Sequence, residues 1–287
     1  MPFTTLIDAA TLLGLAGKAG VVVIDCRFDL INPEAGRRAY LAGHIPGARY
    51  ADLNKDLSAP ITAATGRHPL PLPQDFADLL DLWGIGRKTQ VIAYDDSGGA
   101  YAARLWWMLR WLGHPEAAVL DGGLKAWIGA GGALQAGEEE RLPVWPAAGE
   151  FPLRVDPAAV IDTPGVEAWL RDPANLIVDA RAAERYLGVV EPIDAVAGHV
   201  AGAVNQPFSA NLAPDGRFLP AAELRRLWEK RLGGRNPTRV AAMCGSGVTA
   251  CHNLLSLEIA GLPGARLYAG SWSEWIRDPN RPIARGA

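Results

Sequence analysis

This chain of 287 residues has little net charge, no long apolar run and few cysteines. Its 28 Lys and Arg nearly balance its 31 Asp and Glu, so no overall field favours nucleic acid or an anionic membrane surface. The most apolar stretch, residues 105–112, is interrupted by Arg110 and is far shorter than the roughly 18 residues that a bilayer span needs. Three cysteines are too few for a disulfide framework.

The first ten residues also lack the features of a secretory signal. They carry no positively charged start and contain Asp8, which argues against a signal peptide. Hydrophobic residues make up 49% and charged residues 21% of the chain, as in ordinary globular proteins, which excludes a disordered chain or a coiled coil. We therefore expect a cytoplasmic protein with reduced thiols and with neither nucleic-acid nor membrane partners.

Four segments of the first half recur, in the same order and at nearly constant spacing, in the second half. The pairs are VVVIDCR (21–27) with LIVDAR (176–181), GHIPGA (43–48) with GHVAGA (198–203), VIAYD (91–95) with VAAMC (240–244), and VLDGGLKAW (119–127) with LYAGSWSEW (267–275). This pattern predicts a tandem duplication of one unit of normal domain size. We expect domains at residues 1–135 and 157–287, joined by a linker at 136–156 that is rich in Gly, Pro, Ala and Glu.

Short apolar runs alternate with longer helical patterns in each copy. Strands are expected at 21–25, 91–94, 119–120, 176–179, 239–243 and 266–268, and helices at 75–83, 100–112, 221–232 and 248–260. Thr163 followed by Pro164 predicts the N-cap and first turn of a further helix. This alternation is typical of an α/β fold, here a mostly parallel sheet with helices on both faces in each copy.

A cysteine follows directly after the predicted strand 239–243. Cys244 stands there, and the loop Gly245, Ser246, Gly247, Val248 and Thr249 leads from it into an apolar helix. Ligands of open α/β sheets bind at the carboxyl ends of strands, and the N–H groups at a helix start favour a thiolate and any anion bound to it. We therefore predict that Cys244 is a nucleophile and that residues 245–249 bind the substrate.

The matching position of the first copy carries different chemistry. Residues 95–99, Asp-Asp-Ser-Gly-Gly, stand where the cysteine loop stands in the second copy. A carboxylate cannot act as a sulfur nucleophile, so the first copy is predicted to be catalytically silent.

Motifs spread over the whole chain are similar to those of one enzyme family. They are Asp25-Cys26-Arg27, HIPGA, Trp106-Trp107, Asp121-Gly122-Gly123, Asp179-Ala180-Arg181, the segment from Cys244 to Ala250, and Gly270-Ser271-Trp272-Ser273-Glu274-Trp275. From about Ile24 to Arg285 the chain resembles the two-domain rhodanese-type sulfurtransferases, closest to those that use 3-mercaptopyruvate or thiosulfate. The resemblance implies two rhodanese-like domains. Cys244, Cys251 and His252 lack the CxxC-type spacing and the four ligands of zinc clusters, so we expect no metal, and we expect no cofactor. It also implies a Cys244 persulfide that passes its sulfur to cyanide, a thiol or a protein acceptor.

The loop after the cysteine helps to distinguish family members that use different sulfur donors. Two basic residues there are typical of enzymes that use thiosulfate, and Gly-Ser, as in Gly245-Ser246, is typical of those that use 3-mercaptopyruvate. Arg185 matches the family's arginine that grips the anionic end of the donor. Ile193 stands where the mercaptopyruvate enzymes often have a second arginine.

The resemblance also suggests a serine–histidine–acid relay and further cleft residues. The nearest matches for the relay are His44 and Glu34, although His44 recurs as His199 in the other copy, which favours a structural role. Tyr101 and His68 belong to segments that line the cleft in relatives, with core packing as an equal alternative. Cys26 and Cys251 are expected in the core.

Several other functions are weighed against this one. A cysteine phosphatase or arsenate reductase needs an arginine to close its anion loop, and Ala250 and Cys251 stand there instead. A binding module without catalysis usually lacks the cysteine. A rhodanese that prefers thiosulfate, or a relay that hands a persulfide to a partner protein, stays open because the same cysteine would serve.

Overall fold

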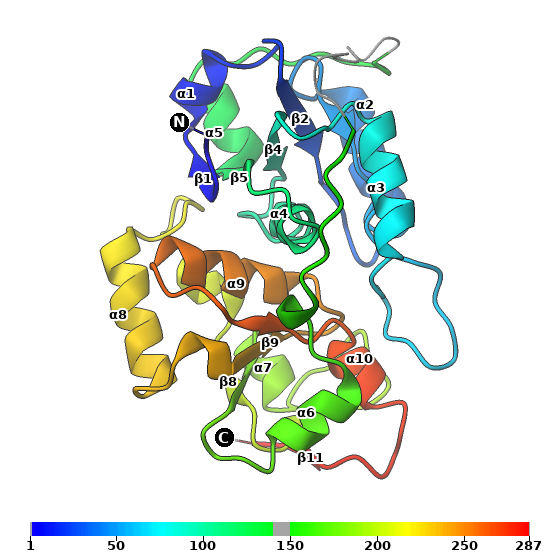
Figure 1. Cartoon of the computed structure of the whole chain (residues 1–287), viewed down its shortest axis with the longest axis vertical. Helices are drawn as coiled ribbons and strands as arrows, with labels where there is room; N and C mark the ends of the chain where they lie inside the picture. Colours follow the sequence, from blue (N-terminus) through cyan, green and yellow to red (C-terminus); the bar gives the residue numbers. More distant parts are fainter. Residues whose placement is uncertain (1, 140–149, 287) are drawn as a thin grey trace. The chain divides into compact units, whose positions relative to one another are not determined.

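The computed structural model describes residues 2–139 and 150–286 of the chain (Figure 1). Part of the predicted linker, residues 140–149, lies outside the described residues. Proximity of Cα atoms divides the chain into two units: Met1–Ala59, Leu70–Asp156 and Pro214–Phe218 form the first, and Pro60–Pro69, Pro157–Ala213 and Leu219–Ala287 form the second. The first predicted domain therefore differs from the first unit, because residues 60–69 pack with the second.

The first unit is built on a five-stranded parallel sheet with the strand order β1-β5-β4-β2-β3. The strands are β1 (Leu6–Ile7), β2 (Val21–Asp25), β3 (Arg49–Tyr50), β4 (Gln90–Tyr94) and β5 (Ala117–Leu120). The helices are α1 (Ala9–Leu13), α2 (Glu34–Ala42), α3 (Pro73–Leu82), α4 (Ala102–Trp111) and α5 (Gly123–Gly129). The apolar runs of β2 and β4 are buried, as expected for central strands of a parallel sheet.

The second unit repeats this plan with a four-stranded parallel sheet in the order β10-β9-β6-β8. Its strands are β6 (Leu176–Asp179), β8 (Val204–Asn205), β9 (Val240–Met243) and β10 (Arg266–Leu267), and β7 (His199–Val200) pairs antiparallel with β11 (Ile283–Ala284). The helices are α6 (Thr163–Trp169), α7 (Ala183–Tyr186), α8 (Ala221–Leu232), α9 (Thr249–Ile259) and α10 (Ser271–Trp275), with 3-10 turns η2 (Pro157–Ala159), η3 (Phe208–Asn211) and η4 (Pro237–Arg239). The predicted α/β class with mostly parallel sheets is confirmed.

The N-cap of α6 is not the residue that the sequence suggested. Asp162, in extended conformation, accepts a hydrogen bond from the Gly165 N–H at 2.9 Å. Thr163 Oγ1 instead lies 2.7 Å from the Tyr268 hydroxyl. The assignment of Thr163 as N-cap was wrong, because the carboxylate one residue earlier reaches the free N–H group of the first turn.

The same buried ion pair ends the first long strand of each unit. Arg27 Nη2 lies 2.6 Å from Asp25 Oδ2, and Arg181 Nη2 lies 2.6 Å from Asp179 Oδ2. All four side chains are buried. Each arginine thus satisfies a carboxylate that burial would otherwise destabilise, and the repeated pair is the structural counterpart of the repeated sequence.

The repeated histidine is likewise held in the same way in both units. The ring of His44 stacks on Tyr40 with centroids 4.0 Å apart, and its Nδ1 lies 2.9 Å from the Tyr40 carbonyl oxygen. His199 stacks on Tyr186 at 3.7 Å, with Nδ1 2.7 Å from the Tyr186 carbonyl oxygen. Since a carbonyl only accepts, Nδ1 donates in both, and the two histidines serve the fold of their units.

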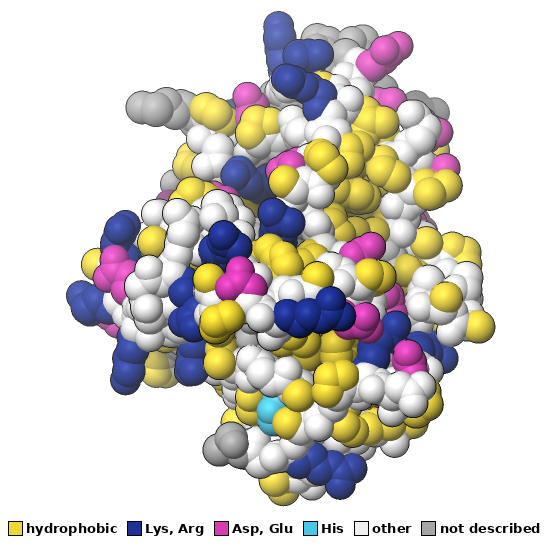
Figure 2. Space-filling view, turned by 60° about the horizontal axis from the view of Figure 1, so that its bottom comes forward, with side chains coloured by type: hydrophobic (Ala, Val, Ile, Leu, Met, Phe, Trp, Pro, Cys, Tyr) yellow, Lys and Arg dark blue, Asp and Glu magenta, His cyan; other side chains and the backbone are white. Residues whose placement is uncertain are grey.

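On the face drawn in Figure 2, basic and acidic side chains are interspersed, with hydrophobic side chains between them. This mixture agrees with a net charge of only −3. Within the described part of the chain, no helix combines the length and the apolar character that crossing a bilayer would require.

Candidate active site

Cys244 follows β9, which lies between β10 and β6 in the sheet of the second unit. Its N–H donates to Ser271 Oγ at 3.0 Å, and its carbonyl accepts from the Trp272 N–H at 3.0 Å. Ser271 has a φ of 53°, and its hydroxyl donates in turn to the Tyr268 carbonyl at 2.8 Å. The start of α10 therefore fixes the backbone of Cys244 on both sides.

Two glycines shape the loop between Cys244 and α9. Gly247 has a φ of +77°, a conformation that residues with a side chain rarely adopt, and a Cβ there would lie only 2.5 Å from the Ala269 carbonyl oxygen. Both the backbone conformation and the lack of space therefore require glycine. A Cβ at Gly245 would lie 2.8 Å from Arg67 Nη2 and 3.6 Å from both terminal nitrogens of Arg185. Gly245, the residue that follows the cysteine, thus leaves room for two guanidinium groups beside it.

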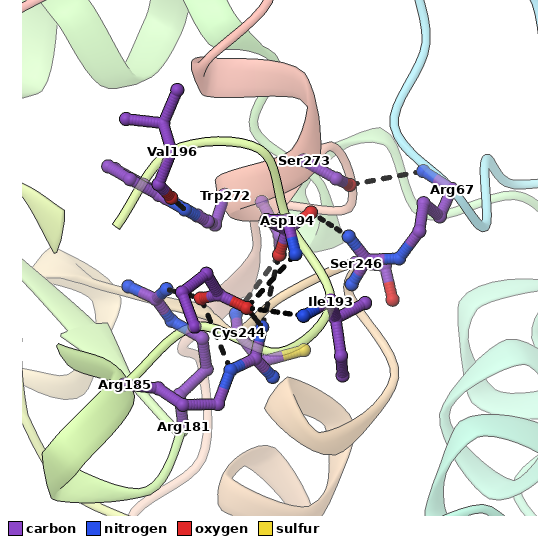
Figure 3. Close-up of polar contacts among 12 residues, drawn as sticks. Arg67, Arg181, Arg185, Ile193, Asp194, Val196, Cys244, Ser246, Trp272 and Ser273 are labelled. Atoms are coloured by element: carbon purple, nitrogen blue, oxygen red, sulfur yellow. Dashed lines mark hydrogen bonds and ion pairs between the residues drawn. The ribbon is translucent and has the colours of Figure 1, made fainter. Parts of the chain in front are cut away.

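These two guanidinium groups come from distant parts of the sequence but from the same unit. Arg185, on α7, donates to Glu191 Oε1 at 2.7 Å and to Asp194 Oδ2 at 3.0 Å, and Arg67 forms an ion pair with Asp194 (Figure 3). Burial lowers the pKa of Arg67; Cys244 opposes that shift, and Arg185 adds to it. The Cys244 sulfur therefore lies within the field of two cationic side chains rather than of Arg185 alone.

A buried histidine contacts the serine of the loop. His68 Nδ1 lies 2.7 Å from Ser246 Oγ, and both residues are buried although they are 178 positions apart in the sequence. Ser246 follows Cys244 by two residues on the same loop. A serine hydroxyl that is hydrogen-bonded to an imidazole can pass a proton in either direction, so this pair can serve as an acid or a base beside the thiol.

The expected relay partners His44 and Glu34 belong to the first unit, whereas the cysteine loop belongs to the second. His44 uses Nδ1 on the Tyr40 carbonyl, and its Nε2 lies 3.3 Å from Glu139, while Glu34 is exposed in the first turn of α2. Among the described residues, the histidine that contacts Ser246 is His68, which belongs to the same unit. A relay through His44 and Glu34 stays a prediction. The sequence resemblance had pointed to His44, which is the histidine that recurs as His199 and is held in the same way in both units.

The remaining candidates lie in packed surroundings. Tyr101, at the N-terminus of α4, packs its ring edge-on against Phe28 at 5.7 Å, and burial raises its pKa to about 12. Cys26 and Cys251 are both buried, the latter with Sγ 3.4 Å from the Gly247 carbonyl oxygen. Burial also raises the pKa of the Cys26 thiol well above its ordinary value, which makes this sulfur a poor nucleophile.

In the first unit a carboxylate occupies the place of the cysteine loop. Asp95, at the end of β4, accepts hydrogen bonds from the N–H groups of Ser97 at 2.8 Å, Gly99 at 2.9 Å, Tyr101 at 2.8 Å and Ala102 at 2.9 Å. The loop that would hold an anion is thus filled by a side chain of the same unit. This explains in physical terms how the first copy can differ in chemistry while keeping the fold.

Asp95→Ala should lower the free energy of unfolding by about 2 kcal/mol, because it leaves several buried N–H groups without an acceptor. We expect a melting temperature at least about 4 °C below wild type by scanning calorimetry. Asp96→Ala, at the exposed neighbour, is the matched control and should melt within about 1 °C of wild type. Equal melting of the two variants would contradict the structural role of Asp95.

Comparison with known proteins places these features in one family. A family model described as a rhodanese-like domain matches residues 8–130 and 164–278. A Pseudomonas aeruginosa protein named "Probable 3-mercaptopyruvate sulfurtransferase" is 49% identical over 288 residues, covering 100% of each chain. The thiosulfate sulfurtransferase of Bos taurus is 34% identical over 271 residues, covering 91% of this chain and 87% of its own.

A solved structure agrees with these relatives. The 3-mercaptopyruvate sulfurtransferase from Leishmania major superimposes with a TM-score of 0.83 at 33% identity, covering 95% of this chain and 74% of its own. The two matches to the family model fall one in each half of the chain. The chain therefore belongs to the rhodanese family and contains two rhodanese-like domains.

Proposed function

We propose that this protein is a sulfurtransferase that moves a sulfane sulfur from 3-mercaptopyruvate, through a persulfide on Cys244, to a thiophilic acceptor. The observation that carries the proposal is the Cys244 loop, which has two guanidinium groups at Gly245 and a serine–histidine pair at Ser246. The curated relatives named above are sulfurtransferases that differ in the donor named.

The first half-reaction begins with the Cys244 thiolate, which attacks the sulfur of the donor. A sulfur–sulfur bond forms, the carbon–sulfur bond breaks, and its electron pair leaves on carbon as the enolate of pyruvate. Arg185 holds the donor's carboxylate, since a guanidinium binds a carboxylate through two parallel hydrogen bonds. Ser246 and His68 supply the proton that converts the enolate into pyruvate.

The second half-reaction returns the enzyme to its starting state. A nucleophilic acceptor, such as cyanide or a small thiol, attacks the outer sulfur of the persulfide, and the Cys244 thiolate departs. No metal or cofactor is needed for these steps, because sulfur itself is both nucleophile and leaving group. A protein thiol would enter the same half-reaction as an alternative acceptor.

The same loop favours 3-mercaptopyruvate over thiosulfate as donor. Thiosulfate is a dianion that leaves as sulfite and needs no proton, whereas mercaptopyruvate carries one carboxylate and needs one. The loop from Cys244 to Val248 has no charged side chain, and it offers the Ser246–His68 pair. The first unit, with Asp95 filling its loop, takes no part in turnover in this proposal.

The proposal predicts a higher kcat/KM with 3-mercaptopyruvate than with thiosulfate when cyanide is the acceptor. The physical reason is that the two guanidinium groups at Gly245 are already paired with Glu191 and Asp194, so the second negative charge of thiosulfate meets no surplus positive charge. Steady-state rates with the two donors, measured side by side on the full chain, provide the check. A higher kcat/KM with thiosulfate would contradict the donor assignment, and sulfur transfer only in the presence of a partner protein would favour the relay.

A further inference from the structure

The first turn of α10 holds the backbone of the cysteine loop through three hydrogen bonds. Ser271 Oγ accepts the Cys244 N–H at 3.0 Å, and the Trp272 N–H donates to the Cys244 carbonyl at 3.0 Å. The Ser273 N–H donates to the Gly245 carbonyl at 2.9 Å. All of these residues are buried. Two of the bonds use backbone N–H groups that any residue except proline supplies, so only the bond to Ser271 depends on a side chain.

The Ser271 hydroxyl also connects this loop to the neighbouring strand. It donates its proton to the Tyr268 carbonyl at 2.8 Å, which leaves a lone pair of the same oxygen to accept the Cys244 N–H. Tyr268 directly follows β10, and its N–H donates to the Ala242 carbonyl of β9 at 2.9 Å. The hydroxyl therefore ties the residue after β9 to the end of β10.

The backbone of Ser271 adopts a conformation that disfavours any side chain. Its φ is 53°, and among the described residues it is the one non-glycine residue with a positive φ. Glycine reaches this conformation without steric cost, so the backbone alone would favour glycine here. Backbone strain of this kind gathers at functional sites, which points to the hydroxyl group as the reason for a serine at this position.

The first unit supplies an internal comparison. Gly123 stands at the position of Ser271 in the repeat and has a φ of 58°. The Leu124 N–H donates to the Asp95 carbonyl at 3.0 Å, which is the counterpart of the backbone bond from α10 to Cys244. A Cβ at Gly123 would lie 2.2 Å from the Asp95 carbonyl oxygen, so no side chain fits there. The unit with a carboxylate thus has the backbone bond alone, whereas the unit with Cys244 adds a hydroxyl.

We propose that Ser271 is a positioning residue, whose hydroxyl holds the backbone N–H of Cys244 and thereby directs the sulfur of the nucleophile. The inference rests on the proposed function, since it concerns the nucleophile of that reaction. With its N–H and its carbonyl both held, Cys244 has one fixed backbone conformation, and its side chain leaves the backbone in one direction. That direction decides whether the thiolate meets the start of α9 and the guanidinium groups at Gly245, which stabilise it.

Ser271→Gly removes the hydroxyl and at the same time relieves the backbone. The kcat with 3-mercaptopyruvate should fall about tenfold, because a misdirected sulfur meets the donor less often in a productive geometry. The KM should stay within about twofold of wild type, since Arg185 keeps its contacts with Glu191 and Asp194. The melting temperature should stay within about 3 °C of wild type, because the relieved strain offsets the lost hydrogen bonds.

Ser271→Ala separates the hydroxyl from the backbone conformation. Alanine also lacks the hydroxyl but keeps the strain of a side chain at positive φ. Its kcat should therefore fall as far as that of Ser271→Gly, whereas its melting temperature should lie below that of the glycine variant. A wild-type kcat in either variant would overturn the proposal, because the hydroxyl would then not be needed for turnover.

Ser256→Ala is the matched control in the same unit. The buried Ser256 hydroxyl accepts from Trp228 Nε1 at 2.8 Å and donates to the Asn253 carbonyl at 2.9 Å, the same pattern as at Ser271. It links α8 to α9, so its loss should lower the melting temperature but leave kcat within about twofold of wild type. Equal losses of kcat in Ser256→Ala and Ser271→Ala would show a general loosening of the unit and overturn the proposal.

A second measurement reads the sulfur without any transfer reaction. The rate at which iodoacetamide alkylates Cys244 follows the thiolate fraction, so its pH profile gives the apparent pKa of that thiol. The midpoint should move to higher pH in both Ser271 variants and stay in place in Ser256→Ala. Profiles that coincide with wild type in both Ser271 variants would overturn the inference and leave the sulfurtransferase proposal intact. Wild-type protein that transfers no sulfur from either donor would refute the proposed function, and the alkylation profiles would still decide the inference.

Discussion

Cys244→Ser is expected to lower sulfur transfer at least about a thousandfold with either donor. A serine hydroxyl stays protonated at neutral pH, and its oxygen cannot form the persulfide on which both half-reactions depend. The fold should survive, because the side chain keeps its size and the backbone contacts of Cys244 with Ser271 and Trp272 do not involve sulfur. The measurement is kcat with 3-mercaptopyruvate and with thiosulfate, together with the melting temperature.

Cys26→Ser is the matched control for this variant. Cys26 is a buried cysteine of the first unit and has no role in the proposed reaction, so its replacement should leave kcat within about twofold of wild type. Retention of more than about a tenth of the wild-type rate by Cys244→Ser would show that another group carries the sulfur.

His68→Asn should lower kcat with 3-mercaptopyruvate about a hundredfold, because it removes the titratable partner of Ser246. Asparagine can still hydrogen-bond the serine hydroxyl, but it cannot exchange a proton at neutral pH. Thiosulfate serves as an internal reference, since sulfite leaves without needing a proton. We therefore expect the thiosulfate rate to change only a few-fold in the same preparation.

The split between donors separates a proton-transfer role of His68 from a role in packing. If both donors lose activity equally, His68 only supports the loop, and the proton of the enolate comes from elsewhere. A pH profile adds a second readout, because the wild-type kcat with mercaptopyruvate should show an ionisation that His68→Asn lacks. If that ionisation persists in the variant, it belongs to another group.

The reactive loop could be predicted from the sequence because its signals are local. A buried strand, a cysteine at its end, two glycines and an apolar helix follow one another between residues 239 and 260, and the structure has β9, the loop and α9 in that order. Each repeated segment is also a short stretch of sequence, and the alternation of strand and helix patterns within each copy predicted the α/β fold. The two-residue strands β1 and β8 carry no periodic signal and are absent from the elements that the sequence predicted.

The partners of the loop could not be predicted in the same way because they depend on long-range packing. His68 and Arg67 reach the loop from a segment that leaves its sequence neighbours in the first unit and packs with the second. His44 was chosen by its resemblance in sequence, yet stacking on Tyr40 holds it in the first unit. Asp194 belongs to no motif in the sequence, and only the structure reveals its contacts with Arg185 and Arg67.

The central claim is that Cys244 carries the transferred sulfur, and intact-mass spectrometry tests it most directly. Wild-type protein incubated with 3-mercaptopyruvate alone should gain the mass of one sulfur atom, and peptide mapping should locate it on Cys244. Addition of cyanide should remove that mass and yield thiocyanate without any partner protein. A sulfur located on Cys26 or Cys251, or turnover with no sulfur ever bound to the protein, would contradict the account.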